Sequence, residues 1–430
     1  MSTETHAPAS TSAPLSTRVL AIFADPVNQA IFALGITQII AWGTTLYALG
    51  VLGRPIANDT GWSQSVVYGG LTMGLLTSGA VSMPAGRWLD RRGGREVMSL
   101  GSLLAALGLL ALAHVRSPTA YLAAWVLIGV AMRLTLYDAA FAALVQIAPT
   151  RGRRAISLVT LFGGVASTLL WPLGAALEFT YGWRTTLIVF ALLNLLVCLP
   201  LHWFGLKRRT TTVQEHAPST ATAAAASASV EARATTYLVG RQRLWAMALF
   251  SVVMATTAFL TGAMAAHLVP VLASQALDPR IAVLLASAKG VAQTLARLVD
   301  LVFGRNLHAI QLGRLTIVLM PLSFLALMLG GPGMIPAVLF ILLFGAANGL
   351  TTIVRGAVPL TLFGPVGYGE ILGKLAVPVL ITNATAPAAF AIAVEQLGMQ
   401  TALAGLTVIA VVATIAMEIM TVWYRRTTHA

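Results

Sequence analysis

Two full charges interrupt an apolar stretch near the middle of the first half of the sequence. The segment GVAMRLTLYD carries Arg133 and Asp138 within an apolar run that extends from about 121 to 147. Two further cations, Lys289 and Arg355, lie in similar apolar surroundings. A charged residue in the middle of a membrane helix costs about 2.5–3.5 kcal/mol on insertion scales, so such residues usually face a cavity or each other. These four residues are the candidates for chemistry.

The three cations outnumber the single carboxylate, and an isolated buried cation is unfavourable. We therefore expect a small carboxylate or similar oxyanion to occupy the site, held by at least one guanidinium in a two-pronged geometry. The alternative is that Asp138 is permanently paired, while the other charges reach the membrane surface or contact backbone carbonyls.

The spacing of Arg133 and Asp138 bears on which partners they find. Five residues at about 100° each place the two side chains roughly 140° apart around a regular helix, so we do not expect them to pair with each other. Tyr137, four residues after Arg133, is placed to hydrogen-bond or stack with it. Asp138 is expected to pair with an arginine in the empty state and to exchange that partner for substrate or a proton. This makes Asp138 the predicted coupling residue.

The composition identifies the elements that position these residues. The chain has 430 residues, of which 57% are hydrophobic and only 10% charged, whereas soluble proteins carry about 25% charged residues. This composition predicts an all-α protein that crosses a membrane several times. A crossing helix needs about 20 apolar residues. Twelve segments qualify: 28–55, 65–86, 96–115, 119–147, 155–178, 184–206, 244–272, 280–303, 313–331, 335–362, 370–394 and 400–423.

The distribution of Lys and Arg predicts the orientation. With both termini inside, twenty basic residues fall on the cytoplasmic side and four on the outer side, as expected for cytoplasmic loops. Residues 1–27 lack the features of a secretory signal, so we expect a disordered cytoplasmic tail. The predicted domains are this tail, an N-terminal six-helix bundle (28–206), a low-complexity cytoplasmic linker (207–243), a C-terminal six-helix bundle (244–424) and a short tail (425–430).

Several functional classes are disfavoured. The net charge of +13 does not indicate nucleic acid, because the basic residues fall between apolar segments. The single Cys198 forms no intrachain disulfide, and the histidines and this cysteine show no metal-ligand spacing. No G-x-x-x-x-G-K-S/T motif is present, so ATP is not expected as the energy source. We expect no cofactor and no enzymatic activity. A non-transporting membrane sensor or enzyme remains a rival.

Two internal repeats relate the halves of the chain. GRWLDRRGGR at 86–95 aligns without gaps to ARLVDLVFGR at 296–305. A second gapless alignment, which matches Gly129 with Gly345 and Pro149 with Pro365, places Arg355 beside the counterpart of Asp138. Two parallel six-helix halves are typical of one large class of transporters. The repeat therefore offers Arg355 as a partner for Asp138, and this pairing would leave Arg133 for substrate.

With these features the chain resembles the major facilitator superfamily over essentially its whole length beyond the tail. GRWLDRRGGR is similar to the loop signature of that family, Gly-x-x-x-Asp-Arg-x-Gly-basic-basic, except that Gly94 replaces a basic residue. The resemblance implies a monomeric transporter in the lipid bilayer that works by alternating access, with no ATP-binding domain. It also implies a cytoplasmic latch between the halves, formed by Gly86, Asp90, Arg91, Gly93 and Arg95 and, through the repeat, by Arg297 and Asp300.

Two short strings narrow the resemblance. NDTGWSQS (58–65) and YGWR (181–184) look like the monocarboxylate and oxalate–formate porter branch, which carries small organic anions with a proton or by exchange. Lys289 stands where monocarboxylate members have an acid and an arginine, so that pair is not matched. The family also places spans one, four, seven and ten around the central cavity, which adds Asn348 as a substrate contact. The predicted function is transport of a small organic anion across the cell membrane, which we expect to be a bacterial inner membrane. The alternative is export of neutral or anionic drugs or toxic compounds.

Overall fold

The computed structural model describes residues 25–206, 237–304 and 307–428. In the first range the helices are α2 (Pro26–Ala41), the π-helical turn η1 (Trp42–Leu46), α3 (Ala48–Thr60), α4 (Gln64–Ala80), α5 (Ser82–Arg92), α6 (Gly94–Ala113), α7 (Pro118–Thr135), α8 (Tyr137–Ile147), α9 (Gly152–Gly164), α10 (Ala166–Leu193), the π-helical turn η2 (Asn194–Cys198) and α11 (Leu199–Gly205). They are followed by α13 (Gly240–Ala273), α14 (Pro279–Phe303), α15 (Ala309–Leu329), α16 (Met334–Phe363), α17 (Tyr368–Leu397) and α18 (Met399–Thr428). No strand occurs in these ranges, which confirms the predicted all-α membrane architecture. The tail before residue 25 and the linker from 207 to 236 lie outside the described residues.

The described helices provide twelve membrane crossings. Ten helical runs are long and apolar enough to cross a bilayer, and α4 with α5, bent by 55°, forms an eleventh. One of the ten runs extends over 54 residues, from Gly152 to Gly205. At 1.5 Å per residue it would measure about 80 Å, far more than the roughly 30 Å of hydrocarbon. Gly182, with φ 79° and ψ 165°, breaks this run into two crossings.

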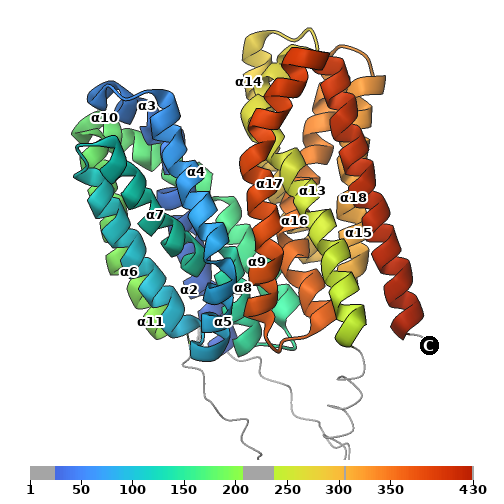
Figure 1. Ribbon diagram of the computed structural model, residues 1–430, viewed down its shortest axis with the longest axis horizontal. Helices are drawn as coiled ribbons and strands as arrows, with labels where there is room; N and C mark the ends of the chain where they lie inside the picture. The colour runs from blue at the N-terminus through green and yellow to red at the C-terminus, as the bar shows by residue number, and fades with distance from the viewer. Residues whose placement is uncertain (1–24, 207–236, 305–306, 429–430) are drawn as a thin grey trace, which may run out of the picture.

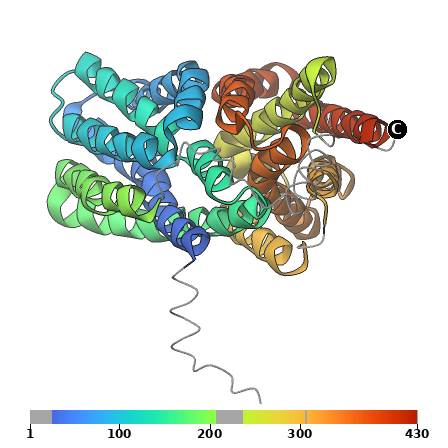
Figure 2. The ribbon, with the colours of Figure 1, turned by 90° about the horizontal axis from the view of Figure 1, so that it is seen from below.

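The helices form two groups that lie side by side (Figures 1 and 2). One group contains α2 to α11 and the other contains α13 to α18. They meet where α17 packs on α5, α4 and α8, and where α9 packs on α14 and α16. We call these groups the N-terminal bundle and the C-terminal bundle.

The hydrophobic core explains why the bundles meet at one end only. At the lower end in Figure 1, one cluster of buried residues combines both bundles, with Phe141 and Ile156 in the same cluster as Val354 and Tyr368. Towards the other end each bundle has a core of its own, one containing Trp125 and the other Phe324 and Phe340. Apolar burial therefore holds the two bundles together at the lower end and leaves them separate above it.

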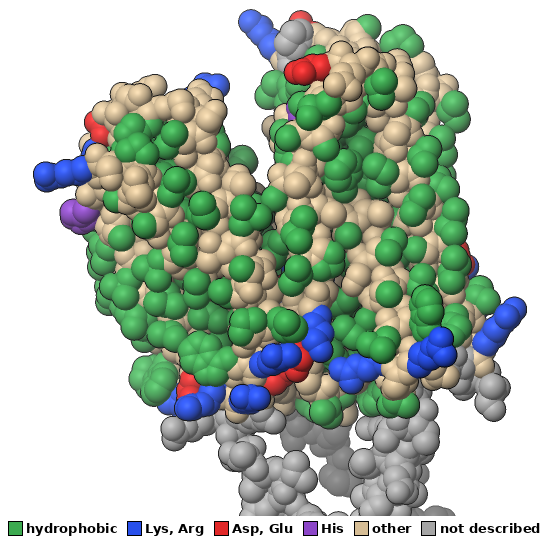
Figure 3. Space-filling model, viewed as in Figure 1, with side chains coloured by type: hydrophobic (Ala, Val, Ile, Leu, Met, Phe, Trp, Pro, Cys, Tyr) green, Lys and Arg blue, Asp and Glu red, His purple; other side chains and the backbone are tan. Residues whose placement is uncertain are grey.

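The molecular surface has the same asymmetry. In the space-filling view a cleft separates the bundles at the upper end and closes toward the lower end (Figure 3). Lys and Arg side chains gather along the lower rim of this face, with a broad apolar surface above them (Figure 3). The structure is thus open at one end and closed at the end that carries the basic loops.

Candidate functional site

Asp138 lies at the junction of the bundles between two arginines. Its Oδ2 accepts hydrogen bonds from Nη1 of Arg133, in the same bundle, and from Nη2 of Arg355, at 2.5 Å, in the opposite bundle. Asp138 and Arg133 are only 8% and 7% exposed. The predicted approach of Asp138 and Arg355 is confirmed. Two guanidiniums share one carboxylate, so this cluster carries a net positive charge.

The expectation that Arg133 and Asp138 do not pair is wrong, because the helix between them is interrupted. Leu136 has φ −77° and ψ −172°, an extended conformation that ends α7 at Thr135 and starts α8 at Tyr137. The rotation of 100° per residue therefore does not apply across this step. The break brings the two side chains into a buried ion pair. Arg133 is consequently not left over for substrate in this conformation.

Gln38 of α2 supports the break and was not identified from the sequence. Its Nε2 donates to the carbonyl of Thr135 at 2.7 Å, and its Oε1 accepts from Nε1 of Trp42 at 3.1 Å. A helix end buried without such a partner would leave carbonyls unsatisfied. The sequence does contain a signal for this contact: a glutamine within an apolar span is expected to be buried, and buried amides are normally hydrogen-bonded.

Among the described residues, Tyr137 forms neither a hydrogen bond nor a stacking contact with Arg133. Its hydroxyl donates to the carbonyl of Thr160 at 3.3 Å, and its ring stacks on Phe141 and lies 4.9 Å from the ring of Trp42. The prediction that it would bond or stack with Arg133 is wrong because Tyr137 begins a new helix, one residue after the break.

Lys289 and Asn348 lie on the neighbouring helices α14 and α16 of the C-terminal bundle. Both are half-buried. The ammonium of Lys289 lies 5.7 Å from the centre of the Phe344 ring, a favourable cation–π contact. Among the described residues, no carboxylate forms an ion pair with Lys289, and Phe344 belongs to the separate core of the C-terminal bundle. Lys289 is therefore a cation without a matching carboxylate there, and no contact in the described part of the chain joins it to Asp138 or Arg355.

Asp90 of the predicted latch joins the two bundles directly. Asp90, at the end of α5, accepts hydrogen bonds from the backbone N–H groups of Gly369 and Glu370 at 2.9 and 2.8 Å. These N–H groups belong to the first turn of α17, where backbone N–H groups have no acceptor within the helix. Arg87 adds an ion pair to Glu370 at 3.1 Å. Asp90 therefore caps a helix of the opposite bundle.

Gly86 permits the close approach of α5 and α17. A Cβ at Gly86 would overlap the backbone carbonyl of Gly369, and a Cβ at Gly369 would lie 2.7 Å from the carbonyl oxygen of Gly86. Gly93 ends α5 with φ 83° and ψ 167°, which L-residues rarely adopt. The glycines of the signature thus serve backbone contact and chain reversal.

Within the described part of the chain, no contact joins Arg91 or Arg95, at the end of the signature, to the C-terminal bundle. Arg91 is exposed, and the guanidinium of Arg95 lies over the ring of Trp203, 4.4 Å from its centre, within the N-terminal bundle. In this conformation Arg95 therefore packs within its own bundle rather than in the latch, whereas the part of Arg91 in the latch stays a prediction. Because Gly93 turns the chain away from α17, residues beyond it point back to their own bundle.

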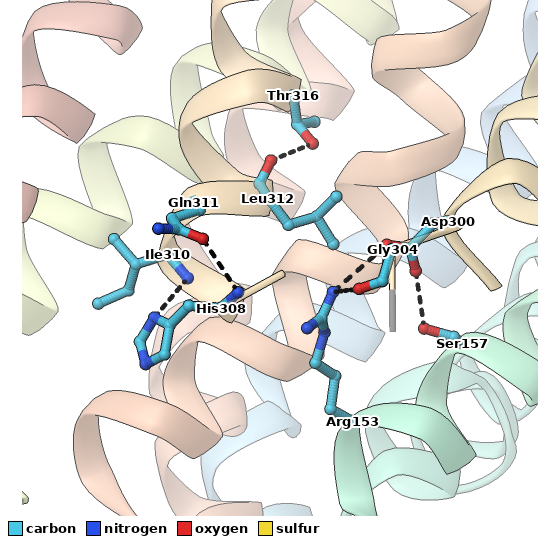
Figure 4. Close-up of polar contacts among 9 residues, drawn as sticks. All are labelled: Arg153, Ser157, Asp300, Gly304, His308, Ile310, Gln311, Leu312 and Thr316. Atoms are coloured by element: carbon cyan, nitrogen blue, oxygen red, sulfur yellow. Dashed lines mark hydrogen bonds and ion pairs between the residues drawn. The ribbon is translucent and has the colours of Figure 1, made fainter. Parts of the chain in front are cut away.

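Arg297 and Asp300 contact the opposite bundle, as their place in the repeat suggested. Arg297 donates to the carbonyls of Thr160 and Gly349, each at 3.1 Å. Asp300 accepts from Ser157 at 3.1 Å and forms an ion pair with Arg153 at 3.4 Å (Figure 4). Asp90 of the N-terminal bundle thus binds the C-terminal bundle, and Asp300 of the C-terminal bundle binds the N-terminal bundle. The repeat relates these two positions. Arg153 and Ser157 were not identified from the sequence.

The two strings that suggested a porter branch lie against each other. Asp59 accepts a hydrogen bond from Nε1 of Trp183 at 3.0 Å and forms an ion pair with Arg184. The guanidinium of Arg184 in turn lies over the Trp183 ring. This contact fastens the end of α3 to the second crossing of α10 and does not involve the central charges.

Comparison with known proteins supports the fold. The model of the Major Facilitator Superfamily matches residues 31–353. An uncharacterized MFS-type transporter, YcxA of Bacillus subtilis, is 26% identical over 224 residues, which are 51% of this chain and 51% of that protein. The chain is thus aligned with about half the length of this curated relative.

Solved structures agree with the whole fold at low sequence identity. The transporter FucP in the outward conformation superposes with a TM-score of 0.65 at 15% identity, over 90% of this chain and 98% of FucP. The human organic anion transporter MFSD10 gives 0.65 at 18% identity, over 94% and 100% of the two chains. The proton:xylose symporter XylE gives 0.67 at 13% identity, over 91% and 95%.

Proposed function

The chain belongs to the Major Facilitator Superfamily and is a membrane transporter rather than an enzyme; from this premise we propose that it moves a small organic anion by alternating access. The transported molecule enters the cleft at the open end, reaches the charges at the bundle junction and leaves when the closed end opens. The proposal includes two modes of coupling: a proton carried by Asp138, or exchange of one anion for another.

One observation carries the choice of an anion. Asp138 is shared by Arg133 and Arg355, so one negative charge faces two positive ones. Lys289 adds a third positive charge whose observed contact is the ring of Phe344. Buried cations without matching carboxylates are costly, and a carboxylate substrate removes that cost by accepting charge-assisted hydrogen bonds. A cationic substrate would add to the repulsion.

A partner exchange at Asp138 supplies the link between substrate and conformation. Arg355 belongs to the C-terminal bundle and Asp138 to the N-terminal bundle, so their hydrogen bond favours the conformation in which the lower end is closed. A substrate carboxylate that takes Arg355, or a proton that neutralises Asp138, weakens this bond. The bonds of Asp90 and Asp300 then have to break as the bundles separate. The predicted latch thus contributes to the free energy needed to separate the bundles at the lower end.

The solved relatives are compatible with this proposal without selecting the substrate. One carries the name of an organic anion transporter, and another is described as a proton:xylose symporter. The fold therefore serves both anionic and neutral substrates, and the argument for an anion rests on the charges of this chain. Membership of the monocarboxylate and oxalate–formate branch remains part of the proposal.

The proposal also includes an orientation. The end that carries the basic loops faces the cytoplasm, following the excess of Lys and Arg in cytoplasmic loops, and the cleft faces outward. Both termini are then cytoplasmic. We place the protein in the inner membrane of a bacterium, as a monomer whose two bundles (28–206 and 244–424) move as units.

A ligand screen tests the substrate class. Purified full-length protein is heated in detergent with lactate, pyruvate, formate, oxalate and neutral sugars, at pH 6 and pH 8, and the unfolding temperature is recorded. A ligand that binds the folded protein at one hundred times its Kd stabilises it by about 2.7 kcal/mol. Stabilisation by a carboxylate supports the proposal. Large neutral drugs added to the same screen test the alternative: stabilisation by these compounds and by no carboxylate favours drug export and contradicts the proposal of an anionic substrate.

A further inference from the structure

Two hollows adjoin each other where α9 meets α14. The first is a groove of about 380 Å³ between α14, α15 and α16. Its wall is apolar and includes Leu295, Val299, Phe303, Leu315, Leu342 and Ala346. The second is a pocket of about 420 Å³ lined by Arg151, Arg153 and Arg154. Asp300 and Gly304 line both hollows, so they form one continuous site.

The groove lies on the surface that faces the bilayer. Leu295 and Phe303 are 55% and 77% exposed on the outside of the bundle. Only 17% of the most apolar stretch of α14 is buried inside the protein. In a membrane protein, apolar side chains exposed at this depth contact lipid chains. A concave apolar surface at that place fits one chain more closely than the flat surface around it.

The pocket at the end of the groove is positively charged. Arg153 donates to the carbonyl of Gly304 at 2.9 Å and lies 3.4 Å from Asp300 (Figure 4). Arg151 pairs with Asp25. Arg154 is exposed, and no contact of its guanidinium was found among the described residues. Three guanidiniums therefore face two carboxylates, and Arg154 in particular is available to an anion.

We propose that this continuous site binds one anionic phospholipid, with an acyl chain in the groove and the phosphate at Arg153 and Arg154. The combination of an apolar groove with guanidiniums at one end matches an anionic amphiphile and neither a neutral lipid nor a free ion. Arginine binds phosphate through two parallel hydrogen bonds, and basic groups near the membrane surface attract anionic lipids. The headgroup lies at the level of the basic loops, which is where the lipid surface meets the protein.

Because the site lies between the two bundles, a bound lipid affects the equilibrium between the closed and open lower end. Arg153 and Ser157 belong to the N-terminal bundle, whereas Asp300 and the groove belong to the C-terminal bundle. A lipid that fills both hollows contacts both bundles only while the lower end is closed. Binding to one of two conformations shifts the population toward it. The anionic lipid is thus expected to stabilise the closed lower end, independently of which substrate is carried.

The test compares lipids that differ only in the headgroup. Full-length protein in detergent is titrated with dioleoylphosphatidylglycerol and with dioleoylphosphatidylcholine, and lipid retained per protein is measured by native mass spectrometry. The first lipid is expected to bind more tightly. Arg154→Gln should weaken its binding about fivefold, the loss expected for one basic residue near the surface. Binding of phosphatidylcholine, whose choline cation offsets the phosphate charge, should weaken much less. Leu295→Trp should fill the groove and weaken both lipids.

Matched controls separate the site from the general lipid surface. Arg241→Gln removes one exposed charge from the start of α13, and Leu284→Trp enlarges a lipid-facing side chain of α14 that does not line the groove. Neither should alter binding. Equal binding of the two lipids, or equal effects of the site and control variants, would overturn the proposal. Displacement of phosphatidylglycerol by inorganic phosphate at similar concentration would also overturn it, because the acyl chain would then contribute nothing.

Discussion

Asp138 and Arg355 are 217 positions apart in the sequence and are joined by a hydrogen bond of 2.5 Å across the bundle junction. Arg133 uses the same carboxylate oxygen from within the N-terminal bundle. The other oxygen of Asp138 is buried and has no hydrogen-bond partner among the described residues. One carboxylate thus orders two guanidiniums at the place where the bundles meet. Removal of that carboxylate leaves two positive charges without a counterion, and the guanidinium of Arg133 is buried.

Asp138→Asn should destabilise the protein strongly. Removing one partner of a buried ion pair costs about 3–5 kcal/mol because the remaining charge stays buried, and here two arginines are left. The unfolding temperature in detergent, followed by tryptophan fluorescence, measures the effect. Asp59→Asn is the matched control, since Asp59 also pairs with an arginine but is exposed. An equally small change in both variants would show that the central ion pair is not buried as described.

Asp90→Ala should favour opening of the lower end. The variant loses two hydrogen bonds from a carboxylate to the N–H groups of Gly369 and Glu370, and hydrogen bonds to charged groups contribute about 1.5–3 kcal/mol each. Maleimide labelling of Ala85→Cys, a buried position beside this contact, measures the opening after Cys198 is replaced by alanine. We expect labelling to accelerate about tenfold or more.

Arg92→Gln is the control for the labelling experiment. Arg92 forms an exposed pair with Glu96 on its own side of the junction, and such pairs contribute little. Labelling should not change in this variant. Unchanged labelling in Asp90→Ala as well would contradict the assignment of Asp90 to the latch.

The twelve crossings were predictable from the sequence because apolar length is a direct requirement of the bilayer. The contact of Asp138 with Arg355 was predictable because the repeat relates their spans. The pairing of Arg133 with Asp138 was not, since it depends on the break at Leu136, and LTLYD contains neither Gly nor Pro to signal one. The break is held by tertiary contacts, among them the bond of Gln38 to Thr135.

The outcome at the latch has a similar explanation. The Gly-x-x-x-Asp spacing predicted a tight contact, and Gly86 and Asp90 make it. The signature did not reveal the partner, which is the backbone of Gly369 and Glu370 rather than a side chain. Backbone partners carry no residue type that a sequence pattern can identify. The same is true of the two carbonyls that accept from Arg297.

Gly86→Ala should impair closure of the lower end. A methyl group at this position meets the backbone of Gly369, which cannot move aside as a side chain would. We expect a lower unfolding temperature and slower uptake of the transported substrate. Gly69→Ala is the control, because Gly69 lies within α4 and a Cβ there meets no atom within 4 Å. That variant should be neutral or slightly stabilised, as alanine is favoured over glycine in helices. Equal behaviour of the two variants would argue against close packing at Gly86.

His308 should make the protein less stable in mild acid. Partial burial and the nearby charge of Arg153 lower the pKa of His308, so the folded state binds its proton more weakly than the unfolded chain. The contribution of neutral His308 to the stability of the fold is present above its ordinary pKa of about 6.5. This contribution is lost as the pH falls through the lowered pKa of the folded state. Protonation also removes the acceptor at Nδ1 that caps the N–H of Ile310 at 3.4 Å (Figure 4).

His308→Asn isolates this effect. Asparagine is a good N-cap and does not titrate, so the variant should lose the additional destabilisation between pH 7 and pH 5 while remaining stable at pH 7.5. Unfolding temperatures at these pH values provide the measurement. An unchanged pH profile would assign the acid sensitivity to other groups.

The most direct test of the central claim is uptake of radiolabelled carboxylates into vesicles that contain Lys289→Gln, Arg355→Lys or Arg355→Gln protein. Lys289 forms no ion pair among the described residues, so Lys289→Gln removes a charge with little cost to folding. Arg314→Gln, which breaks an ion pair with Glu418 within the C-terminal bundle, is the control. The account predicts weaker apparent affinity in Lys289→Gln, partial uptake in Arg355→Lys, little or none in Arg355→Gln, and normal uptake in Arg314→Gln. Unchanged uptake and affinity in Lys289→Gln and Arg355→Gln would contradict an anion site at the bundle junction.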